Sequence, residues 1–299
     1  MQSMSITAVA RASRPSFLIL APLCVLLGVS LAANQPITLH GVDVALVLIG
    51  GLLAHAGVNL LNEYDDFHSG LDLITRRTPF SGGSGALPEH PSAAPQVLIV
   101  AIATLVGIAA IGMYFLWQRG WPMLIIGLSG VFLMVAYTRW LTRSPLWCLL
   151  APGLGFGPIM VLGTLVALGG HIDAVALTVS AVTLLLVSEL LLINQFPDVE
   201  ADRRIGRRHL PIVLGLPIAS RWVAGLLLGA FALIALGQLS NLMPMDAWLA
   251  WLMLPAALWI ALRLPRALKD EVALQQTLSV NVATLLTTLM LLSAGLWLG

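Results

Sequence analysis

Long apolar stretches, separated by short polar segments, run along the whole chain. A stretch of about 20 predominantly apolar residues can cross the hydrocarbon core of a bilayer, about 30 Å thick, as one α-helix. The pattern predicts nine such spans, at residues 15–33, 43–63, 94–117, 121–141, 146–168, 172–195, 218–239, 245–263 and 277–298. We therefore expect an all-α membrane protein in which residues 1–299 form one transmembrane domain.

Two polar stretches rich in acidic residues interrupt this pattern. The first, N-E-Y-D-D-F-H-S-G-L-D, runs from Asn62 to Asp72 after the second span. The second, N-Q-F-P-D-V-E-A-D, runs from Asn194 to Asp202 after the sixth span. The separation of four helices suggests a repeated four-helix unit followed by a final helix. The two acidic stretches of such a repeat are expected to face each other across a central cavity.

The basic residues predict the orientation of the bundle. When the loops alternate between the two sides of the membrane, 14 of the 15 basic residues fall on one side and only Arg119 falls on the other. Basic loops stay in the cytoplasm, so the N-terminus and both acidic stretches are predicted there, in a bacterial inner membrane. The first span follows Arg11 and Arg14 and is long for a signal peptide, so we expect a retained transmembrane helix.

Composition supports this class and excludes others. The chain is 59% hydrophobic and 10% charged, with a mean hydropathy of +0.94, which no soluble globular protein of this size needs. The lipid bilayer is therefore an expected partner. A net charge of +1 and the absence of a basic patch with interleaved aromatic residues give no sign of a nucleic-acid partner. Cys24 and Cys148 are expected to be small apolar residues in or beside spans, not a disulfide or zinc site.

The first polar stretch has the composition of a metal–phosphate site. Asn62 and Asp66 are four residues apart and share one helix face, and Asp72 can return toward them after a glycine turn. Carboxylates held together repel one another unless a cation lies between them. Arg76 and Arg77 follow, and arginine presents a fork of donors to phosphate oxygens. The alternative is a solvated loop in which these carboxylates merely pair with the arginines.

The second polar stretch repeats this arrangement. Asp198 and Asp202 are also four residues apart, and four arginines follow them within six residues. Pro197 is expected to kink or restart the helix, so the placement of Asn194 relative to Asp198 is less constrained. An ordinary membrane–cytosol junction explains the arginines but not the aspartates. Together the two stretches predict Mg²⁺ ions that hold a diphosphate.

These motifs resemble those of the UbiA superfamily of membrane prenyltransferases. The first stretch is similar to the N-D-x-x-D motif in the longer form, ending G-x-D, of its 1,4-dihydroxy-2-naphthoate prenyltransferase branch. The second, continued as R-R-I-G-R-R-H-L, is similar to that branch's D-x-x-x-D-x-x-x-G-K-x-T-L. A third segment, from Gly153 to Thr164, resembles its G-x-G…F-G-P-L-M-V-x-G-T. The resemblance covers nearly the whole chain.

The resemblance implies a nine-helix bundle around a cavity that opens to the membrane and the cytoplasm. Six residues are then expected to bind Mg²⁺ and, through it, the diphosphate: Asn62, Asp66, Asp72, Asn194, Asp198 and Asp202. The four aspartates among them are the expected catalytic residues. Three arginines are expected to contact the phosphates: Arg76, Arg77 and Arg207.

The chain departs from the pattern of this branch at four positions. Glu63 replaces an aspartate, Arg207 stands where lysine is usual, and His209 replaces a threonine. Phe156 follows the G-L-G, where the branch usually has a glutamate. The last departure bears on the identity of the acceptor and not on prenyl transfer itself.

A few polar residues outside the motifs are further candidates. Tyr64, Tyr137 and Arg139 lie near the cytoplasmic mouth and are expected to contact the acceptor, although the tyrosines are equally explained as interfacial anchors. Glu189 lies within the sixth span and is expected either to be protonated or to reach the cavity. We expect His55, in the second span, to be a hydrogen-bonded packing residue and not a base.

The resemblance implies Mg²⁺-dependent transfer of a prenyl group from a polyprenyl diphosphate to a small aromatic acceptor. The leading acceptor is 1,4-dihydroxy-2-naphthoate, in menaquinone biosynthesis, with 4-hydroxybenzoate, homogentisate or another phenol as alternatives. A prenyl-diphosphate cyclase or phosphatase would use the same metal site without an aromatic acceptor. A transporter is a further alternative, but its acidic residues would lie near mid-membrane instead of on one face beside arginines.

Overall fold

The computed structural model describes residues 2–299, and within this range all regular structure is helical. Eight helical segments are long and apolar enough to cross a membrane, and a bent pair at the N-terminus gives a ninth span. The longest helices are α3 (Gly41–His68), α6 (Ala94–Arg119), α7 (Trp121–Arg139), α10 (Ala174–Asn194), α13 (Leu216–Leu239) and α15 (Glu271–Leu298). The predicted all-α membrane fold is confirmed.

The first span begins earlier than predicted and is bent. Helix α1 (Gln2–Ala12) is followed by a 3-10 turn (Pro15–Phe17) and then by α2 (Leu20–Ala33). The two parts meet at an angle of 50°. Arg14 lies at the bend in the left-handed region, with φ of 52°. The prediction of one span over residues 15–33 therefore missed α1, which the bend directs toward α5 and α6.

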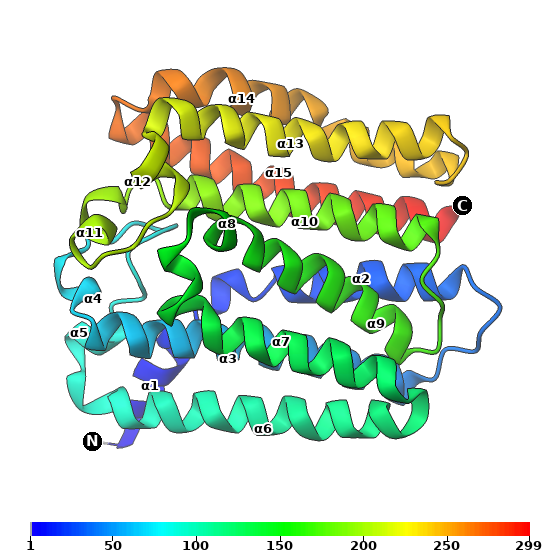
Figure 1. Ribbon diagram of the computed structural model, residues 1–299, viewed down its shortest axis with the longest axis horizontal. Helices are drawn as coiled ribbons and strands as arrows, with labels where there is room; N and C mark the ends of the chain where they lie inside the picture. Colours follow the sequence, from blue (N-terminus) through cyan, green and yellow to red (C-terminus); the bar gives the residue numbers. More distant parts are fainter. Residues whose placement is uncertain (1) are drawn as a thin grey trace.

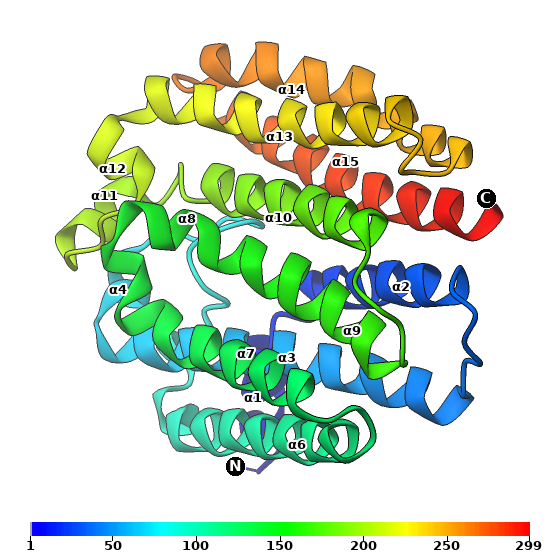
Figure 2. The ribbon, with the colours of Figure 1, turned by 45° about the vertical axis from the view of Figure 1, so that its right-hand side comes forward.

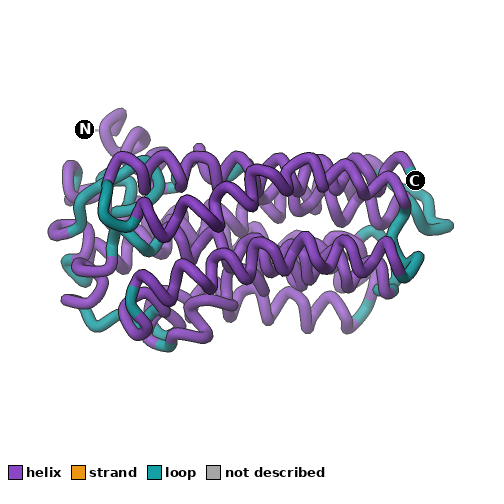
Figure 3. Tube along the Cα trace, turned by 90° about the horizontal axis from the view of Figure 1, so that it is seen from above, coloured by secondary structure: helices purple, strands orange, loops and turns teal. Residues whose placement is uncertain are grey.

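The long helices run side by side (Figures 1 and 3). Helix α3 packs against α6 and α7 in one half, and α10 packs against α13 in the other. Helix α15 lies against α2 and α14 (Leu254–Ala267). Each half therefore contains one helix, α3 or α10, that leads into an acidic stretch. This arrangement agrees with the predicted repeat of four helices plus a final helix.

The fifth span is broken in the middle by a π-helical segment. It consists of α8 (Pro145–Leu154), the π-helix Gly155–Val161 and α9 (Leu162–Ala167). Pro152 and Pro158 remove backbone donors from this region, so a regular α-helical ladder cannot continue through it. The span runs diagonally between α7 and α10 (Figure 2).

The sides of the bundle are apolar. Large hydrophobic side chains away from the ends of the spans are exposed there, among them Val106, Leu128 and Leu262. Such a surface is stable only in contact with lipid, because exposing so much apolar area to water is energetically unfavourable. The protein is therefore a multi-pass integral membrane protein.

The polar elements gather at one end of the bundle. Short helices α4 (Leu71–Ile74), α5 (Ala86–Glu89), α11 (Val199–Arg204) and α12 (Leu210–Leu214) lie together at the left of Figure 1. Helix α11, from the second half, contacts α4, from the first. The two acidic stretches therefore meet, as the repeat predicted.

Candidate active site

A cavity of about 630 Å³ lies between the helices and extends to the end that carries the acidic stretches. All six residues predicted to hold the metal line it: Asn62, Asp66, Asp72, Asn194, Asp198 and Asp202. Arg207 and Tyr137 line it as well. The rest of the wall is largely apolar, with Phe115, Met134 and Leu190 among its residues. The cavity thus joins a charged mouth to an apolar body.

A glycine turn brings Asp72 back toward Asp66. Helix α3 ends at His68, and Gly70 adopts the left-handed conformation with φ of 79°, so the chain reverses into α4. The predicted turn is confirmed. Asp72 is only 4% exposed, and burial raises its pKa to about 8, with the carboxylates of Glu63 and Asp66 acting in the same direction.

Glu63 holds a glycine-rich segment, residues 82–85, across the mouth. It is fully buried and accepts hydrogen bonds from the Ser84 backbone N–H, at 3.0 Å, and from the Ser84 hydroxyl. Arg14 lies 3.4 Å from the same carboxylate. The segment then reaches the second half of the protein, where the Gly82 N–H donates to Asp198 over 3.2 Å. Glu63 therefore shapes the site instead of facing the cavity.

The second acidic stretch begins where α10 ends. Helix α10 stops at Asn194 and α11 starts at Val199, so the predicted break near Pro197 is confirmed. The Asp202 N–H donates to the Asp198 carbonyl over 2.9 Å, which places both aspartates on one turn. Burial raises the pKa of Asp198 to about 7, and the neighbouring Asp202 carboxylate acts in the same direction.

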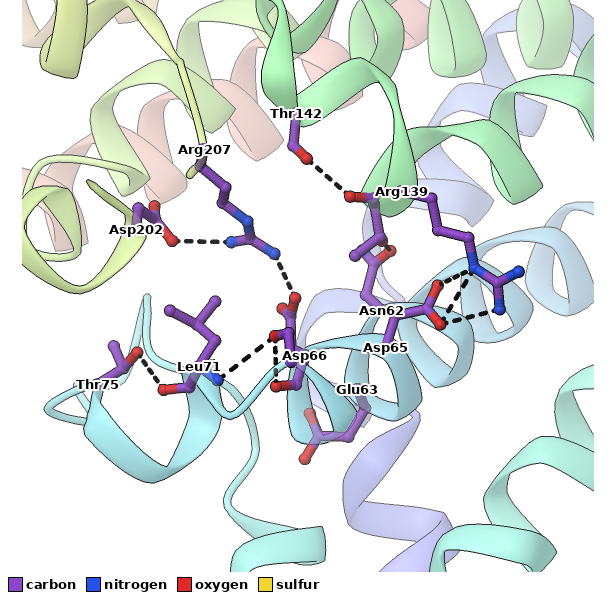
Figure 4. Close-up of polar contacts among 12 residues, drawn as sticks. Asn62, Glu63, Asp65, Asp66, Leu71, Thr75, Arg139, Thr142, Asp202 and Arg207 are labelled. Carbon is purple, nitrogen blue, oxygen red and sulfur yellow. Dashed lines mark hydrogen bonds and ion pairs between the residues drawn. The ribbon is translucent and has the colours of Figure 1, made fainter. Parts of the chain in front are cut away.

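Arg207 joins the two acidic stretches (Figure 4). One guanidinium nitrogen lies 2.9 Å from Asp202, and the other pairs with Asp66 on α3. Burial alone lowers the pKa of this guanidinium, but the two carboxylates outweigh it and hold the pKa above its usual range. His209 contacts the second Asp202 oxygen at 2.9 Å. A single cation therefore neutralises acidic groups from both halves of the protein.

The donor set at this mouth fits Mg²⁺, which prefers carboxylate and amide oxygens. Three such oxygens are buried without a hydrogen-bond partner, one each on Asp72, Asn194 and Asp198. Buried acceptors are rarely left unpaired, so these oxygens indicate a missing ligand. In the described part of the chain, no three His, Cys, Asp or Glu side chains already form a metal cluster. Mg²⁺ is usually held by one or two carboxylates together with waters and substrate phosphates, so the site does not need such a cluster.

Comparison with protein families decides the family of the chain. The model of the UbiA prenyltransferase family matches residues 21–283, which include both acidic stretches and the broken fifth span. The chain belongs to the UbiA prenyltransferase family.

Two curated relatives of this UbiA-family chain are both named 1,4-dihydroxy-2-naphthoate octaprenyltransferase. The protein from Escherichia coli (strain K12) is 29% identical over 294 residues, covering 95% of this chain and 93% of the relative. The protein from Bacillus subtilis (strain 168) is 28% identical over 200 residues, and the match spans 61% of each. A UbiA homolog from Archaeoglobus fulgidus, solved bound to GPP and Mg²⁺, shares the fold. Its TM-score is 0.62 at 12% identity, over 96% of this chain and 99% of that one.

Two of the predicted phosphate-binding arginines lie away from the cavity of this UbiA-family protein. Arg76 is largely exposed and pairs with Glu271 at 2.8 Å. Arg77 pairs with Glu89 at 2.6 Å. Neither lines the cavity, so contact with a diphosphate requires both side chains to leave these partners.

Two of the residues predicted to contact the acceptor also lie outside. The Tyr64 ring packs on His68 with centroids 4.1 Å apart, and Arg139 pairs with Asp65 at 3.0 Å (Figure 4). Tyr137 is the exception, because it lines the cavity. Its neighbour Thr138 donates a hydrogen bond to Asn62 and so orients the amide at the mouth.

The structure also adds residues that the sequence analysis did not assign to the site. Arg14 lines the cavity from the bend of the first span, and Ser81, Gly82 and His209 line its mouth. The sequence analysis named Arg14 before the first span and His209 in the second motif, but it gave no sign of the bend that brings Arg14 to the cavity. Glu189 is fully buried, accepts a 3.0 Å hydrogen bond from Asn281 and lies outside the cavity wall.

Proposed function

We propose that this protein transfers a prenyl group from a prenyl diphosphate to a hydroxylated aromatic acceptor. One observation carries the proposal: acidic stretches from both halves of the chain converge on the mouth of a single cavity whose body is apolar. A diphosphate head group matches the mouth, and a prenyl chain matches the body. The names of the two curated relatives support 1,4-dihydroxy-2-naphthoate as the acceptor and a long prenyl donor.

Asn62, Asp66, Asp72, Asn194, Asp198 and Asp202 hold Mg²⁺ in this proposal. The bound Mg²⁺ neutralises the diphosphate and makes it a better leaving group. Arg207 then turns from Asp66 and Asp202 to the phosphate oxygens, where its planar fork stabilises the charge that grows as the C–O bond breaks. The Gly82 and Gly83 backbone also lines the cavity.

The apolar body of the cavity protects the reaction. Breaking the C–O bond leaves an allylic cation, which water would capture as an alcohol. Phe115, Met134 and Leu190 line the region that the prenyl chain enters, and such a wall excludes water. A ring carbon of the acceptor forms the new C–C bond instead, and loss of a proton or of CO₂ from that carbon restores aromaticity. Lipid on the outside of the bundle accommodates the rest of a long prenyl chain.

We infer that the mouth of the cavity faces the cytoplasm of a bacterial cell. The 14-to-1 distribution of basic residues supports this orientation, because the basic loops lie at the same end as the acidic stretches. Both substrates then reach the site from the cytoplasm and the inner leaflet.

The test is an assay of purified protein with Mg²⁺, prenyl diphosphates of several lengths and a panel of aromatic acceptors. We expect a mass-detected prenylated product with 1,4-dihydroxy-2-naphthoate, and diphosphate release that depends on the acceptor. Product only with 4-hydroxybenzoate or homogentisate would change the acceptor and keep the reaction. Diphosphate release without any acceptor indicates a cyclase or phosphatase. Binding without diphosphate release indicates a transporter.

A further inference from the structure

One polar side chain, His55, lies in the apolar body of the cavity. It lines the wall from α3 and is 7% exposed. Its Nδ1 is buried, and no group in the described part of the chain forms a hydrogen bond with it. The expected hydrogen bond is therefore absent in the described part of the chain, although the ring does pack against Phe156. Because nearly all buried polar atoms in proteins are paired, this nitrogen indicates a partner that enters the cavity.

The π-helical segment of the fifth span fixes the orientation of this imidazole. The ring of Phe156, on that segment, meets the His55 ring edge to face, with centroids 4.9 Å apart and an interplanar angle of 78°. Phe156 itself lines the cavity. Single π-helical turns inside α-helices frequently occur at functional sites, where they redirect side chains. The contact thus holds a polar ring in place without using either of its nitrogens.

The position of His55 along α3 places it deeper in the cavity than the residues at the mouth. His55, Asn62 and Asp66 are seven and four residues apart, so all three lie on one face of the helix. At a rise of 1.5 Å per residue, His55 lies about 10 Å deeper than Asn62 and about 16 Å deeper than Asp66 along the axis. The diphosphate occupies the Asp66 level in the proposed reaction. The interval between the two levels matches the length of an aromatic ring system beside the reacting carbon.

We propose that His55, held by Phe156, forms a hydrogen bond with a ring hydroxyl of the acceptor and so selects hydroxylated aromatic substrates. The proposal rests on the proposed function and deepens it. A neutral imidazole has one acceptor nitrogen, and a phenolic hydroxyl can donate a hydrogen bond to it. A carboxylate can only accept, and the arginines that line the cavity as its donors are Arg14 and Arg207. When the hydroxyl donates to the imidazole, its oxygen pushes more electron density into the ring that attacks the prenyl group.

The test compares His55→Leu and His55→Gln in steady-state assays with Mg²⁺, a fixed prenyl diphosphate and a hydroxylated acceptor. Loss of one hydrogen bond in a buried site predicts an acceptor KM about tenfold higher in His55→Leu. The KM for prenyl diphosphate should stay within about twofold, since the mouth is unchanged. His55→Gln keeps a donor and an acceptor and should remain within about threefold of the unsubstituted protein. His171→Leu, at an exposed histidine far along the chain, is the matched control.

A second comparison separates recognition from packing. The mono-methyl ether of the acceptor lacks one hydroxyl hydrogen, so the unsubstituted protein should use it about tenfold less efficiently than the free phenol. His55→Leu should distinguish the two compounds by less than about threefold, because its hydrogen bond is already absent. If His55→Leu does not fold in detergent, His55→Phe keeps an aromatic ring against Phe156 and supplies the same comparison.

Unchanged acceptor KM in His55→Leu would overturn the inference, and so would an equal loss toward the phenol and its ether. Failure of the proposed function gives a different result. In that case the unsubstituted protein binds prenyl diphosphate and Mg²⁺ but prenylates none of the hydroxylated acceptors.

Discussion

Individual acidic residues in the same stretch have different roles. Glu63 has both oxygens engaged by Ser84 and is fully buried. Asp72 and Asp198 each keep one buried oxygen without a partner. A carboxylate whose bonds are already made within the protein supports the loop, whereas an unpaired one is ready for a ligand. Because both residues also line the cavity, these unpaired oxygens are the ones available to a ligand there.

Alanine at Asp66 or Asp198 tests the proposed metal site. Each variant loses an oxygen donor from the mouth, so Mg²⁺-dependent transfer should fall by at least about 100-fold while the protein still inserts and purifies. Product formation by mass spectrometry measures the loss. Glu200→Ala is the matched control, because Glu200 lies next to this turn with its side chain exposed. Full activity in both aspartate variants would refute the metal site.

Protonation at the mouth predicts how stability depends on pH. The pKa values of Asp198 and Asp72 are raised to about 7 and about 8, whereas the unfolded chain ionises near 3.8. The folded state therefore binds more protons between about pH 4 and 8, and its stability falls as the pH rises through this range. Glu89 acts oppositely, because its pKa is lowered to about 2, but its effect is confined to pH below about 4.5.

Thermal unfolding of metal-free protein in detergent measures this dependence. The midpoint should be lower at pH 8 than at pH 5.5. Asp198→Asn mimics the protonated group and should reduce the slope. A midpoint that increases steadily over this interval would contradict the assignment.

At the scale of helices, glycine allows α8 and the π-helical segment to approach α10. A Cβ at Gly157 would lie 2.5 Å from the Ser180 carbonyl oxygen, and one at Gly153 would lie 2.2 Å from the Ser188 hydroxyl. Real side chains do not approach this closely. The same contact positions the segment that carries Phe156.

Gly157→Ala should therefore destabilise the protein by about 1–3 kcal/mol. The new methyl group would clash with backbone atoms of α10, which cannot move aside as the end of a flexible side chain can. Gly155→Ala is the internal control, since nothing lies within 4 Å of a Cβ placed there. Unfolding in detergent should distinguish the two variants. Equal melting temperatures would show that the π-helical segment and α10 do not pack as described.

At the scale of the whole molecule, the bundle has one charged end and one nearly uncharged end. Both native cysteines are buried, Cys24 at 0% and Cys148 at 2% exposure. A thiol reagent should therefore not label them, and labelling reports only on introduced cysteines. Cysteine introduced at Glu200 should react with a membrane-impermeant maleimide only in inverted vesicles. Cysteine at Ser240, in the loop after α13, should react in intact cells. The opposite pattern would reverse the inferred orientation.

The sequence predicts what depends on local pattern. Span length and four-residue spacing place Asp66 and Asp202 at one end of a bundle, because these features follow from helix geometry. Contacts between residues far apart in the sequence cannot be predicted in this way. Arg207 pairs with Asp66, 141 positions away in the chain, and such pairings depend on tertiary packing. The left-handed bend at Arg14 likewise has no local signal, since only glycine usually adopts that conformation.

The Arg207 bridge has a consequence for how tightly the divalent ion is held. Because the guanidinium already pairs with Asp66 and Asp202, an ion that used those two carboxylates would have to displace it. The affinity for the divalent ion would then equal the free energy of its own contacts minus that of the Arg207 contacts it replaces. It would increase when an anionic substrate binds the released guanidinium. Metal and diphosphate should consequently enter as a cooperative pair, each weak without the other.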